Sequence, residues 1–186
     1  MCRPLLRLDI INYSSFAQIK QDMKKSFNFG WLIVTLLFFV GIQACSTALD
    51  SDYEEIDLMR HGLPIKVMGP PDAEVKASTT MGQRDIQIDG GEDFFIQVLQ
   101  GEFNSGSRDN LLNEQKSFVT ANRFFHRFVL EEGDGFIYEF KIDSLNSNYG
   151  FRRIHIQGDS EYIFRNGMGK IFNEEQALNM FNAVKQ

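Results

Sequence analysis

The 186-residue sequence is poor in several residue types, and each shortage excludes a class of protein. Its two cysteines, at positions 2 and 45, exclude a disulfide-rich scaffold and a four-cysteine metal site. Four prolines and 15 glycines exclude collagen-like and linker-like chains. Basic residues number 19 against 25 acidic ones, and this balance argues against a nucleic-acid-binding protein, which needs a basic surface. The hydrophobic content of 43% is that of a globular chain.

Long apolar runs are scarce as well, with one uncharged stretch at residues 29–42, FGWLIVTLLFFVGI. Met23-Lys24-Lys25 lies just before this stretch, and Ala44-Cys45 follows it. A short basic region, an apolar stretch of about 7–15 residues and small residues at a cleavage site are typical of a secretory signal peptide. A membrane-spanning helix needs about 20 apolar residues, so the stretch is short for a permanent anchor. It therefore predicts export.

Residues Ile42-Gln43-Ala44-Cys45 resemble the lipobox of bacterial lipoproteins. In that family the cysteine receives a lipid thioether, the peptide is cut just before it, and the new amino group is usually acylated, often with palmitate. Gln43 departs from the pattern, in which a small residue is commoner. The resemblance implies that Cys45 is lipidated and anchors the protein to a membrane of the bacterial cell envelope, facing the periplasm or the cell surface. The alternative is a buried hydrophobic helix beside an incidental cysteine.

The signal divides the chain into four parts. Residues 1–22 are expected to be a non-native leader or a misassigned start, so the start codon is Met1 or Met23. Residues 23–44 form the signal peptide, and residues 45–62 combine the lipidated cysteine with an acidic tether or, alternatively, an address that sorts the protein between membranes. Residues 63–186 are expected to form a single domain, long enough to bury one core.

The pattern after residue 62 predicts an α+β fold. Alternating and apolar segments predict strands at residues 63–68, 73–78, 85–89 and 93–100, and two hairpins turn at residues 132–135 and 158–159. Ser107 is a suitable N-cap for an amphipathic helix over about residues 108–123. Asn173 and Gln176 form a capping-box pattern before a last helix. We expect an antiparallel sheet with two covering helices, in the order four strands, helix, three strands, helix.

This order of elements is similar to that of PsbP-like domains, which include bacterial DcrB-like lipoproteins. Two features carry the resemblance, the helix inserted after the fourth strand and the helix that follows the sheet. The resemblance spans residues 63–186 and rests on element order, without a diagnostic motif. It implies a small, non-catalytic accessory protein at a membrane.

A search for catalytic and metal-binding patterns finds none. The three histidines stand in no metal-ligand spacing, and acylation would consume the thiol of Cys45. An acidic cluster, residues 85–93, could supply oxygen ligands to Ca²⁺, but its spacing does not fit an EF-hand loop and favours a solvated hairpin tip. We therefore expect no enzyme activity, no cofactor and no metal.

Basic residues within the acidic domain are the most distinctive candidates for a binding site. Arg127, Arg152, Arg153 and His155 are predicted to bind an anion or a partner, because guanidinium groups match carboxylates and phosphates. Arg123 and Arg165 belong to the same group of basic residues. The alternative is that these side chains form ion pairs across neighbouring strands.

These observations lead to two hypotheses from different classes. The first is a lipid-anchored accessory or binding protein that engages a protein of the cell envelope. The second is a carrier of a small apolar ligand or lipid, held between an aromatic-rich sheet and its helices. A hydrolase with an unrecognised site is a weaker third hypothesis.

Overall fold

The computed structural model describes residues 52–80 and 82–186. The predictions for the leader, the signal peptide and Cys45 lie outside these residues. The described elements are β1 (Glu54–Asp57), the 3-10 helix η1 (Leu58–His61), β2 (Lys66–Gly69), β3 (Glu74–Thr80), β4 (Gln83–Asp89), β5 (Phe95–Glu102), α2 (Arg108–Thr120), β6 (Phe125–Glu132), β7 (Gly135–Lys141), β8 (Ser147–Gln157), β9 (Ser160–Asn166) and α3 (Glu174–Ala183). None of the helices in this part of the chain has the length and apolar content to cross a membrane.

Both helices begin at the predicted caps. The Ser107 hydroxyl accepts a hydrogen bond from the Asn110 backbone N–H (3.1 Å), which satisfies one of the free donors at the start of α2. At α3 the Asn173 side chain accepts from the Gln176 N–H (2.9 Å), and the Asn173 N–H donates to the Gln176 side chain (2.8 Å). This reciprocal pair is the capping box that the sequence predicts.

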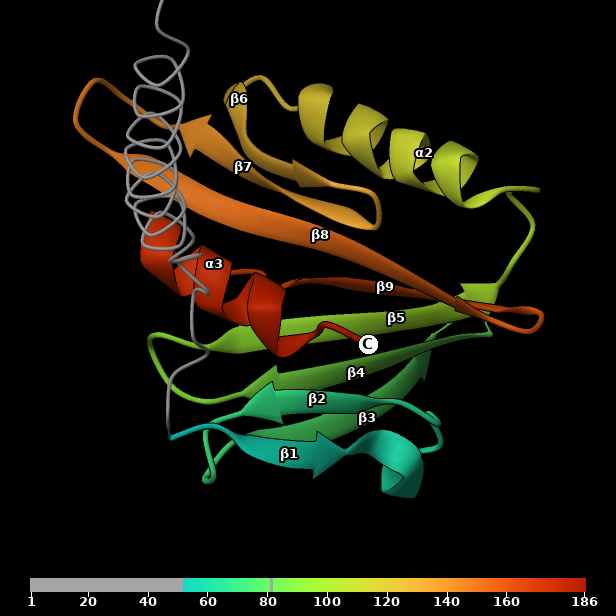
Figure 1. Ribbon diagram of the computed structural model, residues 1–186. Helices are drawn as coiled ribbons and strands as arrows, with labels where there is room; N and C mark the ends of the chain where they lie inside the picture. The colour runs from blue at the N-terminus through green and yellow to red at the C-terminus, as the bar shows by residue number, and fades with distance from the viewer. Residues whose placement is uncertain (1–51, 81) are drawn as a thin grey trace, which may run out of the picture. The chain divides into compact units, whose positions relative to one another are not determined.

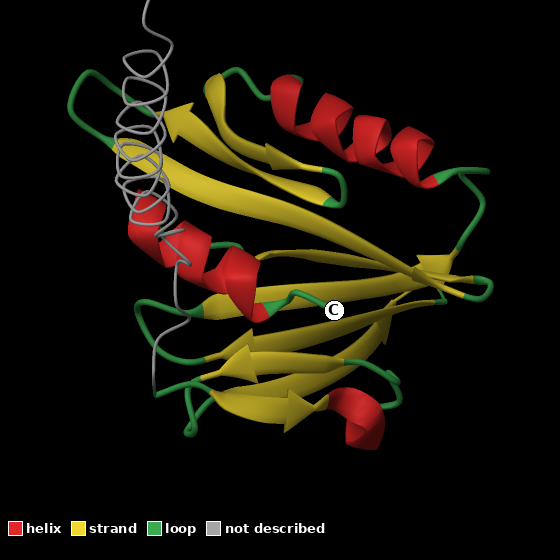
Figure 2. Cartoon of the chain, in the orientation of Figure 1, coloured by secondary structure: helices red, strands yellow, loops and turns green. Residues whose placement is uncertain are grey.

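Seven strands form one antiparallel sheet in the order β3-β4-β5-β9-β8-β7-β6 (Figure 1). After α2 the chain starts at the far edge of the sheet with β6 and adds β7, β8 and β9 in turn toward the centre, so that β9 pairs with β5. The strands β1 and β2 form a separate antiparallel hairpin. Figure 2 shows this hairpin and α3 in front of the large sheet.

The sheet is buried on both faces, and successive residues of a strand point to opposite faces. On β8, Phe151 belongs to the core under α3, whereas Ile154 belongs to the core under α2. The core under α3 also contains Leu58, Leu63 and other residues of the β1–β2 region. We call the two sides the α3 face and the α2 face.

The structure confirms a mixed α+β architecture with a large antiparallel sheet and two helices, and corrects the strand count. Five strands precede α2 and four follow it, instead of four and three. The strand β1 was missed because its sequence, EEID, is dominated by charge, although Ile56 packs against the core. Ordered structure therefore begins before the expected domain start at Leu63.

Candidate functional site

The structure separates the four predicted binding residues. Arg127 on β6 donates from its Nε to Glu139 on β7 (2.7 Å), so it forms the cross-strand ion pair of the alternative interpretation. His155 lies on β8 next to the ring of Tyr162, with 5.9 Å between the ring centroids. Partial burial, and secondarily the charge of Arg108, lowers the pKa of His155.

Arg153 is a structural residue of the α3 face. Its side chain is 3% exposed, and its guanidinium donates to Asp134 (Nε–Oδ2 2.9 Å), to Glu132 (Nη2–Oε2 2.7 Å) and to the carbonyl of Phe181 (Nη1–O 2.9 Å). It also lies over the Phe181 ring, 4.2 Å from the centroid. Through these contacts the guanidinium holds α3 against the β6–β7 turn. Most of its donors are already used, so the guanidinium has little capacity left to bind a ligand.

Arg152, the preceding residue of β8, points to the opposite face and lacks the carboxylate partners that surround Arg153. It pairs in register with Arg165 of β9, which places the two side chains next to each other on the α2 face. Both line a pocket of about 300 Å³ between the last turn of α2 and residues 167–170. We call this pocket the arginine pocket.

The positive charge of the arginine pocket is not neutralised within the described chain. Neither Arg152 nor Arg165 forms an ion pair with a residue in ranges 52–80 and 82–186, and the Nε of Arg152 is buried without a hydrogen-bond partner. Burial lowers the pKa of Arg152, and the charge of Arg165 lowers it further. Two like charges side by side without a counter-ion are unfavourable in the free protein, and an anion would relieve that cost.

Neutral polar groups surround the two arginines. Arg165 donates from its Nε to the side-chain oxygen of Gln97 (2.8 Å), and Gln97 in turn donates to Asp85 (2.6 Å). The Gln97 amide therefore stands between Arg165 and that carboxylate. Burial raises the pKa of Tyr138, so its hydroxyl stays neutral beside Arg152, and it donates to the side-chain oxygen of Asn166 (3.5 Å).

The remaining basic residue of the arginine pocket, Lys170, already has partners. Its ammonium contacts Asp89 (2.6 Å) and the carbonyl of Gly91 (2.6 Å), and this contact is the main reason why the pKa of Asp89 is lowered. Lys170 also lies over the Phe95 ring, 4.8 Å from the centroid. The free positive charge of the pocket therefore comes from the two arginines.

The composition of the arginine pocket favours an anionic ligand. Among its described lining residues there is no carboxylate, histidine, cysteine, serine or threonine, while Phe118, Phe140 and Met168 supply apolar wall. Guanidinium groups hold carboxylate or phosphate oxygens through paired hydrogen bonds. The carbonyl end of α2 opposes an anion by about 0.3–1 kcal/mol, less than charge-assisted hydrogen bonds of about 1.5–3 kcal/mol each supply.

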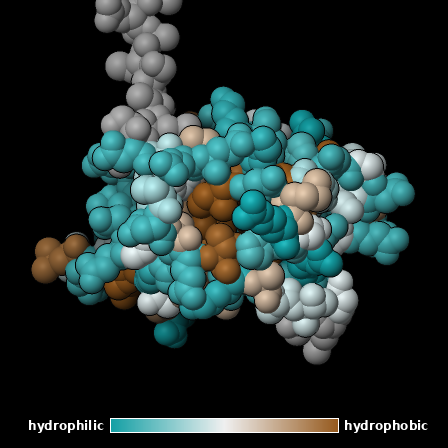
Figure 3. All heavy atoms as spheres, turned by 90° about the horizontal axis from the view of Figure 1, so that it is seen from below, coloured by the Kyte–Doolittle hydropathy of each residue, from teal (hydrophilic) through white to brown (hydrophobic). Residues whose placement is uncertain are grey.

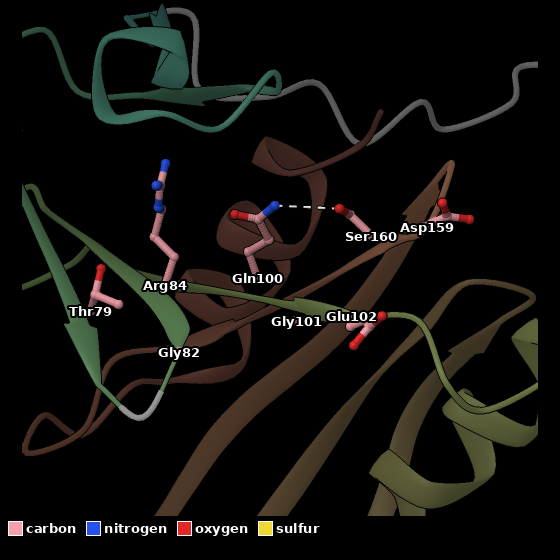
Figure 4. Close-up of a pocket in the computed structure, with 8 residues that line it drawn as sticks. All are labelled: Thr79, Gly82, Arg84, Gln100, Gly101, Glu102, Asp159 and Ser160. Carbon is pink, nitrogen blue, oxygen red and sulfur yellow. Dashed lines mark hydrogen bonds between the residues drawn. The ribbon is translucent and has the colours of Figure 1, made fainter.

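A second hollow, of about 270 Å³, lies between β4, β5 and the β8–β9 turn (Figure 4). Its one basic residue, Arg84, donates to the carbonyl oxygens of Gly62 (2.7 Å) and His61 (3.3 Å), and Figure 4 shows it pointing away from Glu102 and Asp159. This hollow therefore has no free cation to offer an anion. No group of three or more metal-ligating side chains occurs among the described residues.

The sequence identified Arg152 and noted Arg165, but it could not show that they meet. The alternation of β8 and β9 indicates that both residues lie on the face opposite the aromatic core positions, but the pairing of the two arginines depends on the register of the strands.

Comparison with protein families, with curated proteins and with solved structures finds no match. The functional argument therefore rests on the site itself.

Proposed function

We propose that the protein is a lipid-anchored, non-catalytic binding protein of the bacterial cell envelope, and that it holds an anionic group of its ligand or partner in the arginine pocket. One observation carries the proposal: two adjacent arginines line a pocket whose described residues include no carboxylate. The anchor is the proposed lipidation of Cys45.

The chemistry of the ligand is that of a carboxylate or a phosphate. An exposed acidic segment of an envelope protein would supply such a group. The apolar wall formed by Phe118, Phe140 and Met168 also suits an anion that carries an apolar portion, which is the form that the alternative carrier function would take.

Thermal unfolding of the full chain in nonionic detergent tests the pocket, with inorganic phosphate and acetate as separate probes. A ligand at about 100 times its Kd stabilises the native state by roughly 2.7 kcal/mol, which for a chain of this size corresponds to roughly 5–10 °C in Tm. We expect phosphate, acetate or both to raise the Tm of the wild type. Sodium chloride at matched ionic strength controls for general salt effects.

Arg152→Met and Arg165→Met should each weaken that response at least tenfold in ligand concentration, because each removes one guanidinium and keeps an unbranched side chain. Arg123→Met is the matched control, since Arg123 is exposed and does not line the arginine pocket. Equal responses in all four proteins would contradict the proposal. In-cell cross-linking through a C-terminal tag then identifies a protein partner, which must be captured by Arg123→Met and lost in Arg152→Met.

A further inference from the structure

The large hydrophobic side chains that the described domain exposes are concentrated at one end. Six such residues are exposed, and five of them share this end: Phe118, Ile142, Leu145, Met168 and Ile171. Leu145 is the most open, at 91% exposed. The sixth, Met59, lies in η1 at the opposite end (Figure 1). We call the set of five the apolar end.

Contacts between separate elements bring these five residues together. Phe118 and Met168 line the same arginine pocket. Ile142 and Leu145 belong to the β7–β8 connection. Near the start of β8, the Asn148 side chain accepts from the backbone N–H of Phe172 (2.9 Å), and this bond joins the β7–β8 connection to the β9–α3 loop that carries Met168 and Ile171. Figure 3 shows a largely hydrophilic face with hydrophobic residues near its centre and a group that projects at its left end.

The chain reaches the domain at this same end. The ring of Tyr53, just before β1, packs edge-to-face on Phe94 with 5.3 Å between centroids. The next residue, Phe95, accepts a hydrogen bond through its carbonyl from Gly167 (2.6 Å), beside Met168. The first described residues therefore lie near the loop that carries Met168 and Ile171.

We propose that the apolar end lies against the surface of the lipid bilayer. This inference rests on the proposed anchor at Cys45, from which seven residues lead to Asp52. At most about 3.3–3.6 Å per residue, that segment spans no more than about 25 Å. A tether this short holds the end at which the chain enters the domain close to the membrane.

Physical chemistry favours the bilayer as the occupant of this surface. Inserting the five side chains removes apolar surface from water, and the anchor makes the contact intramolecular, so a weak contact is enough. The charges nearby have both signs, with Lys141 and Arg123 against Asp143 and against Glu174 and Glu175, which follow Ile171 in the chain. A zwitterionic lipid surface meets this mixture without strong repulsion, and long basic side chains can reach its phosphates.

Tryptophan fluorescence in vesicles tests the orientation. Trp31 is the only tryptophan of the chain and lies in the predicted signal peptide, so the lipidated protein cut before Cys45 gives a silent background in which single tryptophans can be placed. This lipidated protein is reconstituted into phosphatidylcholine vesicles with or without brominated acyl chains, which quench only at short range. Leu145→Trp and Met168→Trp probe the apolar end, and Met59→Trp is the matched control at the far end.

We expect bromine quenching of Leu145→Trp and Met168→Trp to exceed that of Met59→Trp at least threefold. Equal quenching at all three positions would overturn the orientation. Blue-shifted but unquenched emission at the apolar end would indicate a protein neighbour and would overturn the bilayer as occupant. Mass analysis of Cys45 on the same sample reports the anchor, and the phosphate response reports the arginine pocket, so failure of the proposed function is read separately.

Discussion

Two consecutive arginines of β8 show how one residue type takes two roles. Arg153 is surrounded by Glu132, Asp134 and the Phe181 carbonyl, which satisfy its charge in the interior. Arg152 is partly buried beside Arg165 and lacks an ion pair within the described chain. Side-chain alternation alone places them on opposite faces. The first arginine supports the fold, and the second leaves unused binding capacity.

This difference predicts opposite effects of one substitution at adjacent positions. Arg153→Met should lower the free energy of unfolding by about 2 kcal/mol, which is below the roughly 3–5 kcal/mol for a fully buried ion pair because both carboxylates keep some contact with water. Arg152→Met should raise it by about 1 kcal/mol, as expected when a partly buried charge without an ion pair is removed from a binding site. Thermal unfolding of the full chain in detergent, without added phosphate, measures both. A loss of stability in Arg152→Met as large as in Arg153→Met would assign Arg152 a structural role.

The sequence shows which residues are basic, but it does not show which carboxylate each arginine contacts. Arg127 and Arg153 both carried the signal of an anion site, and both have carboxylate partners from other strands or turns. Those partners depend on strand register, and a shift of one residue would move every side chain to the other face. The register becomes visible only in the folded sheet.

At the scale of elements, one carboxylate connects three strands. Glu139 on β7 accepts from Arg127 on β6 (2.7 Å) and, through its other oxygen, from the Ser147 hydroxyl on β8 (2.7 Å). The Ser147 bond and then the Arg127 bond lower the pKa of Glu139. The side chain is 9% exposed, so these partners replace most of its water.

This arrangement predicts a pH-dependent contribution to stability. A carboxyl group whose pKa is lower in the folded state stabilises the protein above its unfolded pKa, near 4.3, and this contribution is lost as the pH falls through the folded pKa. Glu139→Gln should therefore cost about 1–2 kcal/mol at pH 7, where it weakens two hydrogen bonds to a charged group. The difference from the wild type should shrink steadily below pH 4.

Thermal unfolding between pH 7 and pH 3 measures that difference. Glu55→Gln is the control, because the Glu55–Lys66 pair is more than half exposed on both sides and should contribute less than about 1 kcal/mol at any pH. A wild-type advantage over Glu139→Gln that stays constant down to pH 3 would contradict the link to ionisation.

Elements with a strong local pattern could be predicted from the sequence, and elements that depend on distant partners could not. The helix α2 begins after Ser107, and α3 begins after Asn173, because each of these side chains accepts a hydrogen bond from the backbone N–H three residues on. The strand β1 has no such local signal, since three of its four residues are acidic. It exists because β2 pairs with it and because Ile56 reaches the core.

At the scale of the whole molecule, several features meet at one end of the domain. The first described residues, the arginine pocket and the apolar end all lie near the loop of residues 167–171. A sequence pattern shows periodicity within an element, but it does not show which ends of distant elements coincide. The antiparallel order of the sheet brings them together, because β5, β9 and β8 are neighbours.

A lipid anchor would hold this end of the domain near the membrane, and the anchor can be tested at the sulfur of Cys45. The chain has two cysteines, and the lipobox interpretation assigns the lipid to the sulfur of Cys45 and removes Cys2 with the residues that precede it. In bacteria supplied with an alkyne analogue of palmitate, we expect labelling of the wild type and of Cys2→Ser, and complete loss of labelling in Cys45→Ser. The unlabelled variant should leave the membrane fraction on carbonate washing if its signal segment is removed, or keep its uncleaved signal, which mass analysis would show.

Labelling that persists in Cys45→Ser would place the lipid elsewhere and remove the short tether. The domain would then have no reason to present its apolar end to the bilayer, whereas the arginine pocket would keep its unpaired charge and its response to phosphate.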